Sequence, residues 1–168
     1  MTSGDHRPEP LYAAPPKEML AAFLDFHRAT LLWKIEELSD EEVRRPLTAS
    51  GVCLLAIVKH SAMVERWWFQ ISFAGLDVPM GWSKEDPNSD WRIEPHETTE
   101  QIVELYKTEC ARSREIIARA AWDDLAKQPG RRPGLTFGWI LTHMVEEVAR
   151  HNGQADILRE MIDGATGE

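Results

Sequence analysis

Hydrophobic residues recur at helical spacing in four long segments of the chain. From Lys17 to about Leu38 they return every three or four positions, which predicts an amphipathic helix. The stretch from about Val52 to Phe73 contains no proline or glycine and is apolar on most sides, as expected for a helix packed by several neighbours. A third helix is predicted to start at Thr98 or Thr99 and to end near Ala121, and a fourth to run from about Thr136 to Ile162.

The ends of these segments carry clear signals. The sequence "TTEQ" at 98–101 combines a capping hydroxyl with a glutamine a few residues later, and Gly164 is placed to end the last helix. Ser39 caps a short extra turn that Pro46 stops. Because no segment alternates apolar and polar residues as a strand does, the pattern predicts an all-α fold, specifically an up-and-down four-helix bundle.

Two segments fall outside the helical pattern. Residues 1–15 contain Pro8, Pro10 and Pro15 with few periodic apolar positions, which predicts a flexible N-terminal arm followed by one bundle domain at 16–168. Residues 74–97 are rich in Gly, Pro, Asp, Asn and Ser and form a long loop between the second and third long helices. Loops of this length in small domains are usually functional, so we expect this one to form part of a pocket.

Composition narrows the classes of partner. A net charge of −9 argues against nucleic acid, whose binding needs clustered lysine and arginine, and the one basic sequence, "GRRPG" at 130–134, is interpreted as a solvated turn. No apolar run approaches the roughly 18 residues of a membrane helix, and the N-terminus has no apolar signal core. We therefore expect a cytoplasmic protein without a membrane partner. Cys53 and Cys110 lack CxxC spacing and are predicted to be buried free thiols.

Polar residues interrupt the apolar face of the last helix, in "LTHMVEEVARHNGQADILRE" at 141–160. Glu147 and His151 are four residues apart, so their side chains share a helix face and can converge on one metal ion. His60 lies near the middle of the most apolar helix, where an unpaired imidazole would cost desolvation energy, and it is the natural third ligand. Spacing alone leaves a second interpretation open, in which these are a surface helix pair and a hydrogen-bonded core histidine.

Two imidazoles and one carboxylate, with further positions left to water or substrate, are typical of a catalytic metal site. The same ligand set suits Zn, Ni, Fe(II) or Mn. His143 lies one turn before Glu147 and about 12 Å of axial rise from His151, too far to share the ion easily. It is a candidate catalytic residue acting beside the ligands or toward the substrate, with simple packing as the alternative.

Several other polar and aromatic residues receive structural interpretations. Gly153 is predicted to let a neighbouring helix approach closely beside the site. Arg28 and Glu65 are interpreted as a solvated pair rather than an interhelical one near the site. Three tryptophans, namely Trp67, Trp68 and Trp139, are interpreted as core residues rather than as a substrate platform, although aromatic walls would suit an apolar electrophile.

Two stretches, "LLAIVKHSAMVERWWF" at 54–69 and "WILTHMVEEVARHNGQADILREMIDGATG" at 139–167, resemble the DinB/YfiT-like four-helix bundles. Within them the chain is similar to the branch of mycothiol-dependent maleylpyruvate isomerase and the mycothiol S-transferases, and "PLTASGVCLLAIVKH" and "DILREMIDG" fit that branch as well. The resemblance spans nearly the whole chain after the N-terminal arm. It implies one metal ion held by His60, Glu147 and His151, with glutamate rather than histidine at the second position.

The resemblance also implies a reaction. Members of known activity bind the sulfur of a low-molecular-weight thiol such as mycothiol and pass it to a small electrophile, and a divalent cation supports this by favouring thiolate over thiol. The isomerase has an additional C-terminal domain at its site, so we expect a homodimer partner or the 74–97 loop to supply that wall. A metal-binding, stress-responsive bundle that is not an enzyme and a metal-assisted hydrolase remain alternatives, because all three need the same ligands.

Overall fold

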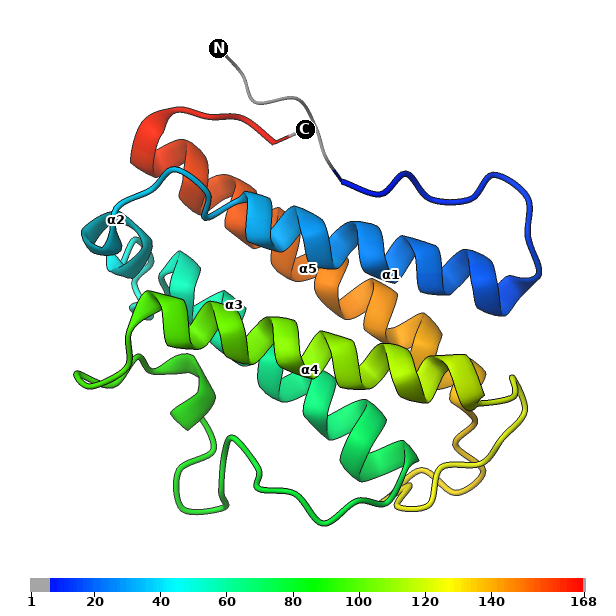
Figure 1. The fold of residues 1–168 in the computed structure, drawn as a ribbon. Coiled ribbons are helices and arrows are strands. Elements are labelled where there is room, and N and C mark those ends of the chain that lie inside the picture. Colours follow the sequence, from blue (N-terminus) through cyan, green and yellow to red (C-terminus); the bar gives the residue numbers. More distant parts are fainter. Residues whose placement is uncertain (1–6, 168) are drawn as a thin grey trace.

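This computed structural model describes residues 7–167, which form an all-helical chain (Figure 1). In that range there are five α-helices and no strand. The helical elements in chain order are α1 (Pro16–Trp33), α2 (Asp40–Arg44), α3 (Leu54–Glu65), the π-helix η1 (Arg66–Phe73), the 3-10 helix η2 (Ser89–Trp91), α4 (Thr99–Arg119) and α5 (Phe137–Asp163). Of the predicted arm at 1–15, residues 1–6 lie outside the described part, and residues 7–15 contain no helix.

Local capping signals determine most helix ends. The side chains of Ser39 and Thr98 accept hydrogen bonds from backbone amides three residues later and form complete capping boxes at the starts of α2 and α4. Thr136 caps α5, and Gly164 ends it with a φ of 80°, a left-handed conformation that glycine adopts without steric cost. The predicted bounds of α5 therefore hold to within one residue.

Two predicted helices differ in detail. The first helix ends at Trp33 rather than near Leu38, because Glu37 has a φ of 64°, which a right-handed helix does not allow. Arg159 of α5 donates hydrogen bonds to the freed carbonyl groups of Lys34 and Glu36. The predicted single α-helix over 52–73 begins at Leu54 and changes at Arg66 into the π-helix η1, a wider winding that apolar spacing does not distinguish.

The order of helix directions differs from the predicted up-and-down arrangement. Lys59 of α3 pairs with Glu97 just before α4, and Arg66, further along, pairs with Glu109 of α4. Later residues of α3 thus contact later residues of α4, which means that these two helices run in the same direction. Helices α1 and α5 also run in the same direction (Figure 1). The segment 74–98 must therefore return along the length of α3, which explains why this connection is so long.

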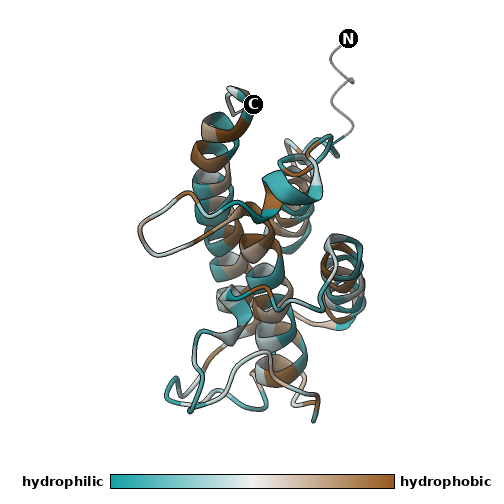
Figure 2. Ribbon diagram, turned by 90° about the vertical axis from the view of Figure 1, so that its left-hand side faces the viewer, coloured by the Kyte–Doolittle hydropathy of each residue, from teal (hydrophilic) through white to brown (hydrophobic). Residues whose placement is uncertain are grey.

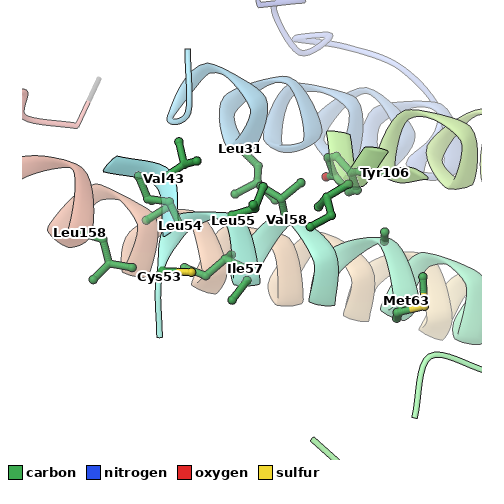
Figure 3. Packing of buried hydrophobic residues seen from close by; sticks show 14 of the residues in the cluster. Leu31, Val43, Cys53, Leu54, Leu55, Ile57, Val58, Met63, Tyr106 and Leu158 are labelled. Atoms are coloured by element: carbon green, nitrogen blue, oxygen red, sulfur yellow. The ribbon is translucent and has the colours of Figure 1, made fainter. Parts of the chain in front are cut away.

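Hydrophobic side chains from every α-helix meet between α3 and its neighbours. Figure 3 shows Leu31, Val43, Tyr106 and Leu158 converging on α3, and all four are buried. A second buried cluster forms around η1 and the start of α5. Figure 2, which is coloured by hydropathy, shows that the segments between the helices are largely hydrophilic or neutral. As predicted, the two cysteines are buried free thiols.

Arg28 and Glu65 form a buried ion pair, which corrects their interpretation as solvated. The guanidinium of Arg28 donates from Nε and Nη2 to both carboxylate oxygens of Glu65, at 2.7 and 2.6 Å. The side chains are 2% and 0% exposed. Burial lowers the pKa of Arg28, but the charge and hydrogen bonds of Glu65 raise it more, so the guanidinium stays charged.

Two further interpretations are corrected by exposure. Trp68 is buried as predicted and Trp67 is partly buried, but Trp139 is 45% exposed and does not belong to the core. A Cβ built on Gly153 has no neighbour within 4 Å, so no helix approaches closely there. Among the described residues, no helix combines the length and hydropathy needed to cross a bilayer.

Candidate metal centre

The three predicted ligands meet where α3 crosses α5. His60 comes from α3, and Glu147 and His151 come from successive turns of α5. The Oε1 atom of Glu147 lies 3.8 Å from Nε2 of His60 and 3.3 Å from Nε2 of His151. One ligand atom from each of the three residues lies within 4.8 Å of the others. Residues far apart in sequence are thus brought to one point.

The outer nitrogen of each imidazole is held by a hydrogen bond. Nδ1 of His60 donates to Oδ2 of Asp90 at 2.7 Å, and Nδ1 of His151 donates to Oε1 of Gln154 at 2.9 Å. A carboxylate can only accept, so the proton of neutral His60 stays on Nδ1 and the lone pair of Nε2 points toward Glu147. Partners of this kind commonly fix the orientation and tautomer of metal-binding histidines.

Asp90 and its neighbour Trp91 were not identified from the sequence. Both lie in η2, within the long loop, and Asp90 is buried. The only feature of the sequence that pointed to them was the unusual length of the 74–97 loop that contains them. The indole of Trp91 stacks on the ring of His60 at 4.0 Å and contacts His151 edge-on at 5.5 Å. One side of the centre is therefore covered by an aromatic ring from the loop.

Trp91 also lines a cavity of about 420 Å³. Its lining includes Arg44, Ser50, Asn88 and Arg92 besides Trp91, so it offers many hydrogen-bonding groups. None of the three candidate ligands lines it. Apolar residues, among them Pro46 and Ile93, complete the lining, so Trp91 borders both this mixed cavity and the candidate centre.

Electrostatics at the centre follow from its geometry. Hydrogen bonds to His151 and His60 hold the pKa of Glu147 well below the usual carboxyl range, despite partial burial. Burial lowers the pKa of His60, but Asp90 and Glu147 raise it more, so this pKa lies above the ordinary 6.5. Without a cation, a proton on His60 is the positive charge that this arrangement favours.

The donor set fits a divalent cation. When both imidazoles are neutral, with their protons on Nδ1, neither can donate to Glu147, and two Nε2 lone pairs and a carboxylate oxygen then face one another as three acceptors. A cation at their centre satisfies all three, and three protein ligands leave positions for an external molecule. The arrangement does not choose among Zn, Ni, Fe(II) and Mn.

His143 lies between this centre and a group of aromatic side chains. It falls with Glu146 and Glu147 in a second group whose ligand atoms lie within 4.8 Å of one another. Its ring stacks on Trp139 at 5.0 Å and meets Trp68 edge-on at 4.8 Å. The side chain is thus beside a candidate ligand, and its catalytic role stays a prediction.

Comparison with known protein families gives a match over most of the chain. The protein family described as mycothiol-S-transferase matches residues 19–164. This span contains the three candidate ligands, His143 and the whole loop with Asp90 and Trp91. No curated protein matches the chain.

Proposed function

The chain belongs to the mycothiol S-transferase family, and on this premise we propose that it is a metal-dependent enzyme that joins the sulfur of mycothiol to a small electrophile. The proposal includes a cytoplasmic location and a DinB-like four-helix bundle, formed by the four long helices, as the frame of the site. The observation that carries it is the convergence of His60, Glu147 and His151, with both imidazoles held from outside.

In this proposal His60, Glu147 and His151 hold the cation, with zinc as the first candidate. The cation would supply positive charge that favours the thiolate form of a thiol at neutral pH. Asp90 and Gln154 keep the two Nε2 atoms aimed at the centre. Trp91 covers one side of the site and keeps water from it.

The reaction balances without a further reagent. The thiol loses its proton to solvent, its sulfur forms a bond to the electrophilic carbon, and the leaving group departs with the bonding electrons. The hydroxyl-rich body of mycothiol would take the cavity beside Trp91, where Arg44, Asn88 and Arg92 offer hydrogen-bonding groups. A partner subunit in a homodimer is proposed to complete the wall.

Elemental analysis followed by thiol titration tests the proposal. Protein purified without added metal is analysed, and the metal-loaded form is titrated with mycothiol by calorimetry. We expect one metal per chain and saturable thiol binding. If the protein binds metal but the metal-loaded form does not bind mycothiol, S-transfer would be overturned and metal-assisted hydrolysis would become the favoured function. If the protein contains no metal, a bundle that is not an enzyme would be favoured.

Variants of the ligands test the metal assignment. His60→Ala and His151→Ala should lose the metal and Glu147→Gln should weaken it, with the helical content kept. Glu160→Gln is the control, because Glu160 also lies on α5, is exposed and belongs to neither group of candidate ligands. If the three ligand variants bound metal as the parent does, the assignment would be wrong.

A further inference from the structure

An aromatic strip leads away from the candidate metal centre along α5. It consists of Trp68, Trp139 and His143, whose rings contact one another with centroids 4.8 to 5.5 Å apart. His143 also approaches the carboxylate of Glu147. At about 6 Å of rise for every four residues, the strip reaches about 12 Å from Glu147 to Trp139. It joins the metal centre to the start of α5.

The far end of the strip is open. Trp139 is 45% exposed, although tryptophan is a residue that a core readily takes up. Its indole lines a cavity of about 380 Å³, together with Thr136 and the residues of the preceding turn. A planar ring can therefore reach this indole from solvent.

An arginine stands over this end of the strip. The guanidinium carbon of Arg132 lies 5.2 Å from the ring centroid of Trp68 and 5.8 Å from that of Trp139. Within residues 7–167 no acidic side chain pairs with Arg132, although the chain carries a net charge of −9. The two indoles position the guanidinium without neutralising it, so its charge and donors stay available to an anion.

We propose that the aromatic strip and Arg132 form the subsite for the electrophile, and that this subsite takes planar aromatic electrophiles carrying an anionic group such as a carboxylate. This inference rests on the proposed S-transferase function. The ring of the electrophile lies against Trp139, its carboxylate accepts from Arg132, and its reactive carbon points along the strip toward Glu147. His143 is a positioning residue, because its ring backs the indole of Trp139.

The basic "GRRPG" turn at 130–134 is exposed, as predicted. Arg131 and Arg132 are both exposed, and Arg131 has no aromatic contact in the described chain. Arg132 instead leans over two indoles that border a cavity. The two neighbouring arginines thus provide a matched pair for an experiment.

Turnover is measured with 4-chloro-3-nitrobenzoate and with its methyl ester, using mycothiol and the metal-loaded protein. In each, the sulfur of mycothiol bonds to the ring carbon and chloride leaves with the bonding electrons. Arg132→Gln should lower kcat/KM for the acid about tenfold, as expected for losing a charged hydrogen bond near solvent. For the ester, kcat/KM should stay within about twofold of the value for the parent protein. Trp139→Leu should raise KM for both substrates. Arg131→Gln is the control and should change neither.

Binding is measured separately from turnover, by calorimetry with the unreactive probes 4-nitrobenzoate and 4-nitrobenzyl alcohol. Parent protein should bind the anion more tightly, and Arg132→Gln should remove that preference. Anion binding that depends on Arg132 in a protein without thiol-dependent turnover would overturn the proposed function and keep the subsite. The subsite would be overturned, and the proposed function kept, if Arg132→Gln lowered kcat/KM equally for the acid and the ester. The same conclusion would follow if Arg131→Gln lowered kcat/KM as much as Arg132→Gln does.

Discussion

Replacing Asp90 by asparagine tests how the long loop supports the metal centre. Asp90 is 2% exposed, and its Oδ2 atom accepts from Nδ1 of His60 at 2.7 Å. The substitution keeps the shape of the side chain and removes its charge. Metal affinity should fall because the imidazole loses the partner that fixes its tautomer and raises its basicity.

The magnitude follows from the orientation of the new amide. Losing such a partner typically costs about 10- to 100-fold in metal affinity, or about 1.4 to 2.7 kcal/mol. The other oxygen of Asp90, Oδ1, is buried without a hydrogen-bond partner in the described chain, so nothing there holds the asparagine amide in the orientation of the carboxylate. If the NH₂ group turns toward Nδ1, the proton of His60 moves to Nε2 and blocks the ligand atom. We therefore expect a loss near the upper end, about 100-fold.

Competition against a chromophoric chelator at neutral pH measures this affinity, with circular dichroism as a check on folding. The matched control is Asp86→Asn, because Asp86 lies in the same loop, pairs with Arg92 and has a side chain that is 47% exposed. The control should bind metal within about twofold of the parent. Equal affinity in Asp90→Asn, or an equal loss in both variants, would refute the argument that this hydrogen bond orients His60.

Three further predictions concern protons, the buried pair and one glycine. Metal affinity should keep rising above pH 6.5, because the raised pKa of His60 lets protons compete with the metal there. In the metal-free protein, protonation of His60 should stabilise the fold below pH 6.5, and this stabilisation should be lost as the pH rises through the folded-state pKa. Denaturation at several pH values measures the change in stability. Glu65→Gln should cost about 3 kcal/mol of unfolding free energy, because the buried guanidinium of Arg28 keeps only the partly exposed Asp25 as an acidic partner, and the double variant Arg28→Met with Glu65→Leu should cost less, since it leaves no buried guanidinium behind. Gly153→Ala should raise the melting temperature, worth about 1 kcal/mol, with metal affinity unchanged.

Local sequence signals predicted the parts of the fold that depend on neighbouring residues. The hydroxyl caps and Gly164 set helix ends by contacts within a few positions, so they could be identified without the tertiary structure. The approach of Glu147 to His151 likewise follows from helix periodicity. His60 was proposed as the third ligand from the desolvation cost of an unpaired imidazole and from the family resemblance, because helical spacing does not indicate which helices are neighbours.

The buried pair was misread although its signal was present. Arg28 follows Leu24 by four residues and precedes Leu31 by three, so it lies on the most buried stripe of α1. Glu65 occupies the equivalent place between Ala62 and Phe69. When each of two helices carries a charged residue of opposite sign within its apolar stripe, the two charges are expected to pair across the interface between the helices. The position of a residue in the stripe therefore predicts its burial better than its charge does.

The relative direction of α3 and α4 explains how a loop residue reaches His60. A short hairpin would have ended beside the last turn of α3, far from the middle of that helix. Since α4 instead starts near Lys59, in the first half of α3, the chain must travel back about 20 Å from the end of η1, and a loop this long, at up to about 3.3 Å per residue, has length to spare. The excess is folded into η2, which puts Asp90 and Trp91 against His60. The long crossover is therefore both the topological connection and the outer support of the candidate metal centre.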